Sequence, residues 1–541
     1  MTNIRKTTNK IDLKRISANF FSNLKPLNIS FLLTLIFSSL LIKTAWLCDD
    51  SMITLRSVLN FTHGYGLVFN IGERAQSYTH PIWMLLLSLV SFITGEVFFT
   101  TLFISMVFAL AAYGIALYVS RKSIYSISIA GLSLIASKAF IDYSTSGLEN
   151  PLSFLLFGIL MLLLLEKSST PEIRLTRAVF IGSLIFLCRM DYAVILAPIV
   201  SLLCFQTKSV KKSLLGILVG GIPAFSWLLF SLIYYGTVFP NTYFAKLSTN
   251  IPKIQYLYQG LLYVYDSSLY DSFTLATIVT ATIYTIFFLK DNTRKSVATG
   301  VILYCLYIVN IGGDFMSGRY FAIPLYISVF LLSDLFVRLN RKSLIAVVMV
   351  AYFSCANIIS ISLPSSRVIH AHGINNEQAF YYGRDGNAAF SFGLLAPNRD
   401  YPDVTNWRRD TEPNVIDDVQ IRCGLLGNHA LSSKPNTHWI DPCGLTDPLL
   451  ARLPIDTSID STDGNRFGWR IGHIKRRVPE GYAESIASGV NVIQDPDIAR
   501  FYDLIKVVVS DPVFSRKRLV YLFKFSGIKT FEDFKSSSFK E

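Results

Sequence analysis

Two adjacent carboxylates, Asp49 and Asp50, stand directly after the first long apolar run of the chain. They open a polar stretch that reaches residue 80 and also holds basic residues, glycines and aromatic side chains. Acids alone could bind a cation or move protons, and a carboxylate within reach of an alcohol can accept its proton as a new bond forms. These two carboxylates are therefore the first candidates for catalytic residues.

Four further polar clusters interrupt apolar sequence farther along the chain. They are STSGLENP with Glu149, CRMD with Arg189 and Asp191, YYGTVFPNTYFAK with Asn241 and Lys246, and GGDFMSGRYF with Asp314 and Arg319. Taken alone, each could be a solvated anchor or a turn beside a membrane span. An arginine and an aspartate between short apolar helices, however, need a partner or a polar cavity. Five such clusters on one predicted face indicate a shared cavity at the outer membrane boundary.

The mixture of acids and bases narrows the chemistry of that cavity. A guanidinium holds phosphate oxygens through two parallel hydrogen bonds, and a carboxylate can take the proton of an acceptor hydroxyl. Sugar transfer from a polyprenyl phosphate needs both groups. A transporter more often places its charges near the midplane and shows repeated halves with broken helices. The sequence shows no internal repeat, and its polar groups sit at the ends of apolar runs.

The elements that carry these clusters follow from composition. Of the 541 residues, 51% are hydrophobic and only 16% are charged, against about a quarter charged in soluble globular chains. The mean hydropathy is +0.43. These values predict a polytopic α-helical membrane protein. The net charge of +13 is explained by basic cytoplasmic loops. No motif of nucleic-acid recognition accompanies it, so nucleic acid is not expected as a partner.

Eleven apolar runs are expected to form membrane spans. They are 29–47, 97–119, 124–140, 151–166, 176–188, 192–206, 213–235, 272–290, 295–311, 320–338 and 343–362. A full crossing needs about 20 apolar residues and rarely fewer than about 17, so the shorter runs should pack against neighbouring helices. Residues 82–94 are also apolar, but counting them as a crossing would reverse every later loop. They are predicted to lie at the outer boundary or to cross halfway.

Basic residues divide the loops between two faces. Clusters at 121–122, 167–177, 208–212, 290–295 and 338–342 fall in alternate loops and, with the basic N-terminus, mark the cytoplasmic face. This predicts a cytoplasmic N-terminus (1–28), a transmembrane domain (29–363) with its first periplasmic loop at 48–80, and a periplasmic C-terminal domain (364–541). The last is long enough for its own core. Its runs NVIQ, LIKVVVS and RLVYLFKF predict strands of a mixed α/β fold.

Cysteines and tryptophans add two expectations for the C-terminal domain. Cys423 and Cys443 are candidates for a disulfide, because a periplasm is oxidising. The sequence contains neither a CxxC pair nor an HExxH motif, so a zinc site is not expected. Trp407, Trp439 and Trp469 could stack on sugar rings, but core packing is the expected role.

The clusters carry a family resemblance. The stretch DDSMITLRSVLNFTHGYGLVFNIGERAQSYTHPIW resembles the first extracytoplasmic loop of GT-C-type membrane glycosyltransferases. STSGLENPL, CRMDYAVIL, YYGTVFPNTYFAK and GGDFMSGRYFAIPL resemble successive motifs of one branch, which includes the terminal arabinofuranosyltransferases of mycobacterial cell walls and Gram-negative pilin-modifying arabinosyltransferases. HWIDPCGLTDPLLARLP and RIGHIKRRVPEGY are similar to that branch too, so the resemblance covers residues 30–485.

The resemblance implies a polyprenyl-phosphate sugar donor, with arabinofuranose as the expected sugar, used on the periplasmic side of a bacterial inner membrane. The acceptor would be an envelope glycan or a pilin-like surface protein. Matched by position, Asp49 is the expected reactive carboxylate and Asp50 orients the acceptor or a neighbouring group, although the two roles could be exchanged. Arg189, Lys246 and Arg319 are expected to bind the donor phosphate. Further candidates are Glu149, Asp191, Asn241, Asp314, Arg74, Tyr78, His80, Asp441 and His473.

Three matters stay open from the sequence. Arabinofuranosyl transfers with retained and with inverted configuration both occur around this family, so the carboxylate could act as a base or as a nucleophile. No cofactor is certain, but a divalent cation could bind Asp49, Asp50 or Glu149. The competing functions are a transporter or flippase of polyprenyl-linked sugar and a non-catalytic scaffold for envelope or motility assembly. The intact acidic pair and the charged loops favour the enzyme.

Overall fold

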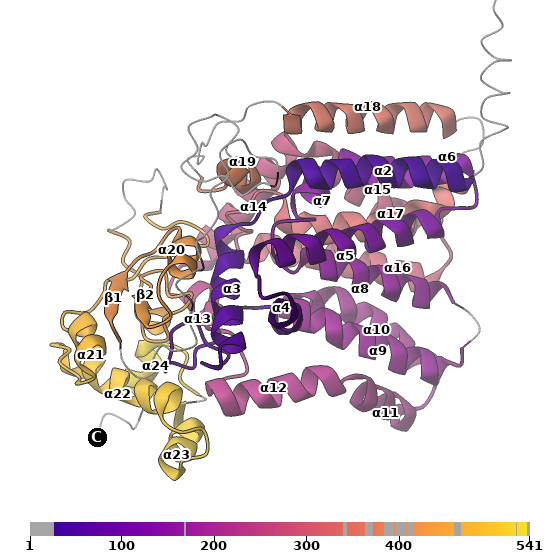
Figure 1. Ribbon diagram of the computed structural model, residues 1–541. Helices are drawn as coiled ribbons and strands as arrows, with labels where there is room; N and C mark the ends of the chain where they lie inside the picture. The colour runs from indigo at the N-terminus through magenta and orange to yellow at the C-terminus, as the bar shows by residue number, and fades with distance from the viewer. Residues whose placement is uncertain are drawn as a thin grey trace, which may run out of the picture.

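Each of the eleven apolar runs is helical in the computed structural model, which describes residues 26–166, 169–338, 343–362, 372–382, 394, 404, 407, 416–458, 467–525 and 527–537. The long helices run beside one another as a bundle (Figure 1). They are α2 (Pro26–Thr44), α5 (Phe98–Val119), α6 (Ile124–Ala136), α8 (Asn150–Leu165), α9 (Pro171–Cys188), α10 (Ala193–Thr207), α11 (Val210–Gly220), α12 (Ile222–Tyr235), α15 (Ser272–Phe288), α16 (Asn292–Asn310), α17 (Ala322–Arg338) and α18 (Ser343–Ser362). The chain is a helical membrane protein.

Length and apolar composition together separate these helices into two kinds. Within the described residues, three stretches are long and apolar enough to cross a membrane: α2, α5 and the continuous stretch Met190–Thr207. Two bent pairs would raise the number to five: α11 with α12, bent by 59°, and α14 (Lys253–Tyr270) with α15, bent by 109°. The shorter α6 packs against α18 and α8 packs against α5, and both are mostly buried. The count of about eleven crossings stays a prediction.

Two helices at one end of the bundle take a different direction. Figure 1 shows α4 (Pro81–Thr94) along its axis, whereas α2 and α5 are seen side-on, so α4 runs across the bundle. It packs against α3 (Asp49–Thr62) and exposes apolar side chains, among them Leu89, Phe92 and Ile93. An apolar helix lying across the bundle suits a position along a membrane boundary, which is the position predicted for residues 82–94.

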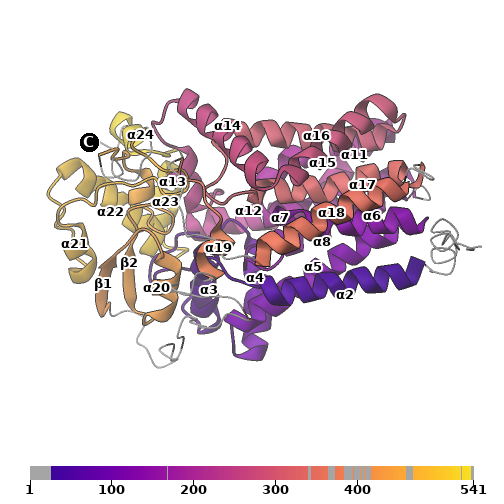
Figure 2. The ribbon, with the colours of Figure 1, turned by 90° about the horizontal axis from the view of Figure 1, so that it is seen from above.

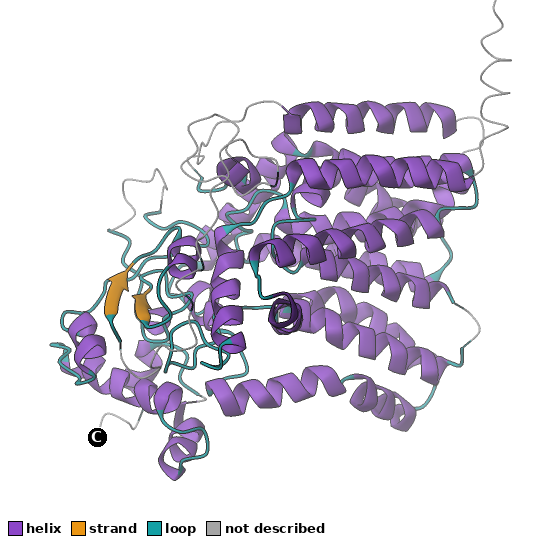
Figure 3. Ribbon diagram, viewed as in Figure 1, coloured by secondary structure: helices purple, strands orange, loops and turns teal. Residues whose placement is uncertain are grey.

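The C-terminal region gathers at the end of the bundle next to α3 (Figure 2). Among its described residues, two strands, β1 (Asp418–Ile421) and β2 (Thr437–Ile440), form a small parallel sheet (Figure 3). Its helices are α19 (Glu377–Tyr382), α20 (Leu426–Ser432), α21 (Tyr482–Ser488), α22 (Pro496–Ser510), α23 (Arg516–Phe525) and α24 (Phe531–Ser536). The predicted boundary near residue 364 and most of the predicted cytoplasmic N-terminus lie outside the described residues.

The strands predicted for this region were wrong. LIKVVVS lies in α22, RLVYLFKF lies in α23, and NVIQ is a loop. In α22 the Asp495 side chain accepts hydrogen bonds from two backbone N–H groups and Pro496 occupies the first turn, which starts a helix. Phe501, Ile505 and Val508 then fall on one buried face at helical spacing. A start signal and a helical period therefore outweigh the β-branched run.

Two hydrophobic cores follow the division between bundle and C-terminal region. The larger core joins buried residues of the bundle helices with a few from the C-terminal region, such as Trp469 and Ile471. A separate core runs through Ile440, Phe501 and Phe531. The C-terminal region thus buries its own apolar surface and also contributes side chains to the bundle.

Helix α3 is fastened to the C-terminal region along residues 427–437, and we call this contact the seam. The Arg56 side chain is fully buried there and donates hydrogen bonds to Ser433 and to the carbonyl oxygens of Phe69, Ala430, Pro435 and Thr437. Gly427 approaches so closely that a Cβ atom would collide with the Asp49 carbonyl oxygen. The seam therefore fixes the first turn of α3, which carries both acids.

Candidate active site

A cavity of about 350 Å³ is lined by residues from all five polar clusters. Helix ends and short turns place them there: α3 begins at the acids, η1 (Met190–Tyr192) follows Arg189, and η2 (Arg319–Phe321) begins at Arg319. The predicted site residues on its wall are Asp50, Tyr78, His80, Arg189, Asp191, Lys246, Asp314 and Arg319. The expected convergence into one cavity is confirmed for these residues.

Glu149 lies behind the wall, fully buried, and connects its positive side chains. One carboxylate oxygen is 3.4 Å from Arg189 and 3.3 Å from Arg319, and the other is 3.1 Å from Nδ1 of His80. Burial alone would raise the pKa of Glu149, but Arg319, His80 and Arg189 hold this pKa well below its usual range. The residue is therefore a permanent anion that orders three side chains of the wall.

The two arginines are already paired with acids. Arg189 donates two hydrogen bonds to Asp191, at 3.0 and 2.6 Å, and its guanidinium lies 4.5 Å from the ring centre of Tyr320. Arg319 donates to Asp314 at 3.4 Å as well as to Glu149. Its Nε is buried and has no hydrogen-bond acceptor among the described residues. Arg319 thus keeps one donor uncommitted, while the charges of both guanidiniums are balanced.

Lys246 stands apart from the arginines. It lies near the end of α13 (Asn241–Leu247), and its ammonium is 5.8 Å from the ring centre of Phe315. Across the described ranges, this ammonium has no hydrogen bond or ion pair with the protein. It is the cation of the wall that an incoming anion could bind without displacing a protein carboxylate.

Asp50 is the acidic counterpart of Lys246 on the cavity wall. In the part of the chain that the structure describes, its carboxylate has no hydrogen-bond or ion-pair partner. Burial raises the pKa of the Asp50 carboxyl, and the positive charges of Lys246 and Arg319 oppose part of that rise. A carboxylate of raised pKa holds a proton more readily than an ordinary one, which suits a group that must accept a proton.

Asp49 is placed elsewhere, although the sequence favoured it as the reactive acid. Successive residues of a helix point about 100° apart, and the Asp49 carboxylate turns to the seam, where it accepts hydrogen bonds from the N–H groups of Gly427 and Asn428 at 3.1 and 2.8 Å. Burial raises the pKa of Asp49 to about 7, against the lowering effect of these bonds. It is absent from the wall of the 350 Å³ cavity.

His80 and Tyr78 brace the wall. His80 contacts the Thr54 hydroxyl at 2.9 Å through Nε2 and Glu149 through Nδ1, so it ties α3 to the start of α8. The Tyr78 hydroxyl is 2.6 Å from that of Tyr235, which in turn donates to the Leu67 carbonyl. Both side chains are buried, at 4% and 1% exposure, so their role at the wall is to hold it.

Two predicted candidates, Asn241 and Arg74, do not line the cavity, and their side chains bind backbone carbonyl groups instead. Asn241 donates to the carbonyl oxygens of Gly444 and Asp447, at 2.8 and 3.0 Å. Arg74 donates to the carbonyl oxygen of Asp511. Asn241 thus joins α13 to the C-terminal region, and Arg74 joins the loop after α3 to it.

Asp441 and His473 also lie outside this cavity. Asp441 is fully buried and accepts hydrogen bonds from the N–H groups of Cys443, Leu445 and Thr446, so it shapes a turn. His473 meets the Phe315 ring edge-on at 4.6 Å and lines a second cavity.

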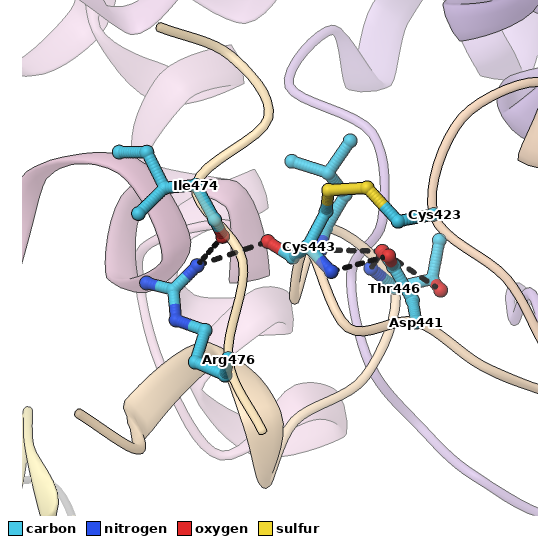
Figure 4. The surroundings of a disulfide bond; sticks show 7 residues. Cys423, Asp441, Cys443, Thr446, Ile474 and Arg476 are labelled. Atoms are coloured by element: carbon cyan, nitrogen blue, oxygen red, sulfur yellow. Dashed lines mark hydrogen bonds between the residues drawn. A yellow bond between two sulfur atoms is a disulfide. The ribbon is translucent and has the colours of Figure 1, made fainter. Parts of the chain in front are cut away.

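A disulfide between Cys423 and Cys443 closes the turn that Asp441 shapes (Figure 4). The predicted pairing is therefore confirmed. The Arg476 guanidinium donates to the carbonyl oxygens of Cys443 and Ile474 on the other side of the turn. The covalent link and these hydrogen bonds fix the loop that leads into α20.

The candidate ligands of a divalent cation do not fit one. Asp49 accepts hydrogen bonds from two backbone amides, and Glu149 is surrounded by two arginines and a histidine. Within the described ranges, one group with metal-ligand spacing remains, Asp441 with the two disulfide cysteines. Its thiols are consumed by the disulfide, and its carboxylate already accepts amide hydrogen bonds. We derive no metal-dependent step.

Three residues near the acids went unrecognised in the sequence. The Tyr320 ring covers the Arg189 guanidinium. Tyr320 directly follows the predicted site residue Arg319, and this adjacency could have identified it as part of the site. Asn375 and Glu377 line the second cavity beside Asp49 and Asp50. They stand between uninformative loop segments, and no spacing pattern links them to α3.

About half of the chain is similar in sequence to two curated enzymes. No family model matches the chain. It is 27% identical over 324 residues to a terminal β-(1→2)-arabinofuranosyltransferase of Mycobacterium tuberculosis, covering 52% of this chain and 51% of the relative. A protein of the same name from Corynebacterium glutamicum is 28% identical over 326 residues, covering 52% and 46%. The chain spans about half the length of the curated relatives that it matches.

One solved structure resembles the chain in shape. It is ArnT from Cupriavidus metallidurans bound to undecaprenyl phosphate, with 13% sequence identity and a TM-score of 0.46, covering 66% of this chain and 68% of that one. A likeness of this size carries no argument about the site.

Proposed function

We propose that the chain is a membrane glycosyltransferase that moves a sugar from a polyprenyl-phosphate donor to a hydroxyl group of an acceptor. One observation carries the proposal. Asp50 and Lys246, whose charged groups have no hydrogen bond or ion pair with other described residues, line the same cavity as two guanidiniums. A free carboxylate serves the acceptor hydroxyl, and a free ammonium serves the donor phosphate.

The atoms of the transfer balance on these residues. The acceptor oxygen forms a bond to the anomeric carbon, and the bond from that carbon to the phosphate oxygen breaks. The proton of the acceptor hydroxyl passes to the Asp50 carboxylate. The phosphate leaves on its lipid with the electron pair of the broken bond, and Lys246 and the uncommitted Nε of Arg319 stabilise its charge.

In this proposal, Asp50 takes the role of the reactive acid, which position had assigned to Asp49. Asp50 accepts the proton, and Asp49 holds the first turn of α3 against the seam. Arg189 and Arg319 present their guanidiniums to the phosphate with their own carboxylate partners still in place. Lys246 supplies the net positive charge.

The proposed sugar is arabinofuranose, and the support is the shared name of the two curated relatives. An envelope glycan is the proposed acceptor for the same reason. A transporter or flippase and a non-catalytic scaffold are not favoured, because neither needs an unpaired carboxylate and an unpaired ammonium in one cavity beside the C-terminal region.

We also propose that the cavity opens on the periplasmic side of a bacterial inner membrane, with the C-terminal region outside and the N-terminus in the cytoplasm. The alternating basic loops support this orientation. A Val490→Cys variant tests it, since this side chain is 63% exposed. Labelling by an impermeant maleimide in intact spheroplasts, above that of the unaltered chain, is expected. Labelling only after lysis would reverse the orientation.

The function is tested with full-length protein in nanodiscs, radiolabelled polyprenyl-phosphate arabinose as donor and a synthetic arabinofuranosyl disaccharide as acceptor. Asp50→Asn should lower turnover by about 10²–10⁴-fold, the usual contribution of a general base, with an unchanged melting temperature. The matched control is Asp503→Asn on the exposed side of α22, which should transfer at the wild-type rate.

Asp49→Asn separates the two acids. It should keep more than a tenth of the wild-type turnover, because its carboxylate accepts hydrogen bonds from backbone amides and does not line the 350 Å³ cavity. Normal turnover in Asp50→Asn would refute the assigned role of Asp50. Failure of the wild-type protein to use any polyprenyl-phosphate sugar would refute the function itself.

A further inference from the structure

The turn between α22 and α23 exposes apolar side chains that the proposed transfer does not use. Among the described residues of the C-terminal region, Phe514 in this turn has the most exposed large apolar side chain, at 79%. Leu519 and Val520 of α23 are exposed as well. Leu522 and Phe525 of the same helix are buried in the core of the C-terminal region. One face of α23 therefore packs on the protein, while the other presents apolar side chains that no described residue covers.

Basic side chains accompany this apolar surface. Arg516 and Lys517 begin α23 and are both exposed. Lys517 lies 3.9 Å from the Asp511 carboxylate, whereas Arg516 has no hydrogen bond or ion pair with other described residues. The surface thus combines apolar groups with a net positive charge. We call it the α23 patch, and its members are Phe514, Arg516, Lys517, Leu519 and Val520.

The α23 patch is held at one end of α12. Figures 1 and 2 both show α23 beside the end of α12 that faces the C-terminal region. Arg518 is fully buried there, and its guanidinium donates to the carbonyl oxygens of Tyr234 at 2.9 Å and Val508 at 2.7 Å. A Cβ atom at Gly236, which directly follows α12, would collide with the Val508 side chain. The patch therefore keeps a fixed position relative to α12.

This end of α12 is where a boundary between lipid and water is expected. The helix belongs to one of the bent pairs that are apolar enough to cross a membrane. It exposes Phe225, Leu229 and Leu232, as lipid contact requires. Its last two residues are tyrosines, which are enriched where a helix leaves the hydrocarbon. Because Arg518 binds the carbonyl oxygen of Tyr234, α23 lies at the level of this boundary.

We propose that the α23 patch rests on the surface of the lipid bilayer. Phe514, Leu519 and Val520 enter the outermost part of the acyl layer, and Arg516 and Lys517 lie at the phosphates of anionic phospholipids. Exposed apolar side chains next to basic ones form the composition that binds a membrane interface containing anionic lipid. The patch also continues the lipid-facing side of α12, so the bilayer around that helix reaches it directly.

The contact gives the C-terminal region a second attachment to the membrane, besides the bundle. The turn that carries Phe514 also holds the loop after α3, since Arg74 donates to the carbonyl oxygen of Asp511. Bilayer, α12 and this loop therefore meet at one turn, which fixes the height of the C-terminal region above the lipid. The inference goes beyond the proposed function and does not depend on it, because it concerns membrane contact alone.

The test places the photo-reactive amino acid p-benzoylphenylalanine at position 514 of the full chain, in nanodiscs of equal parts phosphatidylglycerol and phosphatidylcholine. Because Phe514 is already aromatic and exposed, folding should be unchanged. Irradiation should give a phospholipid adduct, detected by mass spectrometry. The matched control carries the same amino acid at position 490, since Val490 is 63% exposed and follows α21, the helix farthest from the bundle in Figures 1 and 2. Its yield should be below about a tenth, because the interface reaches only about 5–10 Å.

The basic residues are tested separately. Arg516→Gln combined with Lys517→Gln, in the chain that carries the probe at 514, should lower the ratio of phosphatidylglycerol to phosphatidylcholine adducts by at least about fivefold. Lys434→Gln, at an exposed lysine after α20, is the matched control and should leave this ratio unchanged.

The possible outcomes separate the alternatives. A lipid adduct at 514 that loses its preference for phosphatidylglycerol in the double variant supports the proposal. A folded chain that gives no lipid adduct at 514 overturns it, and so does an adduct to a second copy of the chain, which would make the patch a site of self-association. An unchanged lipid ratio in the double variant overturns the assignment of anionic lipid. None of these measurements uses sugar transfer, so failure of the proposed function leaves them unaffected.

Discussion

The 350 Å³ cavity, here called the donor cavity, and the seam both adjoin α3, yet their charges are satisfied in different ways. In the cavity, Arg189 and Arg319 bind carboxylates of other side chains, while Asp50 and Lys246 remain unpartnered among the described residues. At the seam, Arg56 binds mainly carbonyl oxygens of the backbone.

The difference separates groups that can bind a ligand from groups that hold the fold. A side-chain ion pair can share or exchange a partner when a phosphate arrives, because side chains rotate at small cost. A guanidinium bound by several backbone carbonyls cannot be withdrawn without leaving buried acceptors unsatisfied. Burial and charge alone would mark Arg56 and Arg319 as equal candidates, whereas the identity of their partners distinguishes them.

Among the substitutions that test this comparison, the largest combined loss of stability and turnover is expected at Glu149, behind the cavity wall. Glu149→Gln removes the buried anion between Arg189, Arg319 and His80 and should cost about 3 kcal/mol of stability, as for other broken buried ion pairs. Turnover should fall by as much as about 10²-fold, since the guanidiniums lose their positions. Thermal unfolding and transfer kinetics in nanodiscs measure both effects.

Glu149→Asp provides the control for charge. It keeps the anion but shortens its reach, so it should recover part of the stability and of the donor affinity. Equal behaviour of the two variants would mean that the wall does not depend on this anion, and the contrast with the seam would lose its basis.

An intermediate effect is expected at the seam. Arg56→Met leaves several buried carbonyl oxygens without a donor and should lower stability by about 2 kcal/mol. Turnover per folded molecule should stay near that of the wild type, because Arg56 does not line the donor cavity. A chemical-denaturation curve combined with the transfer assay checks this. A selective loss of donor binding would show that Arg56 belongs to the site.

The last prediction concerns the pH dependence of stability at the seam. The pKa of Asp49 is raised from its ordinary 3.8 to about 7 in the folded chain. The folded state thus binds more protons than the unfolded state between these values, so stability falls as pH rises from about 4 to about 7 and is flat above. Asp49→Asn should lack this decline. Parallel melting temperatures of the two proteins from pH 4 to 8 would contradict the shift.

The sequence predicted the convergence of the polar clusters because charge and hydrophobicity act over whole segments. Alternating basic loops placed all five clusters on one face, and short spans required polar side chains to share a cavity. Asp50, Arg189, Lys246 and Arg319 do line one cavity.

Roles within the cavity could not be predicted in the same way. Asp49 and Asp50 are adjacent and chemically identical, and only the packing of α20 on α3 decides which of them faces the cavity. Asn241 stood in a family-like motif but binds backbone carbonyls. Glu377 reaches the neighbourhood of Asp49 and Asp50 only because α19 and α3, which are far apart in the chain, meet in the fold. A single sequence carries no signal for such a contact.

The way Arg56 is held determines where this molecule can be divided. Chimeras that exchange whole outer halves between related enzymes are a common route to new substrate preference, and a junction placed between the bundle and the C-terminal region would look natural by sequence. Here the helix that carries both acids takes its position from carbonyl groups at residues 430–437. In any chimera, residues 49–62 and 427–437 must therefore come from the same parent protein.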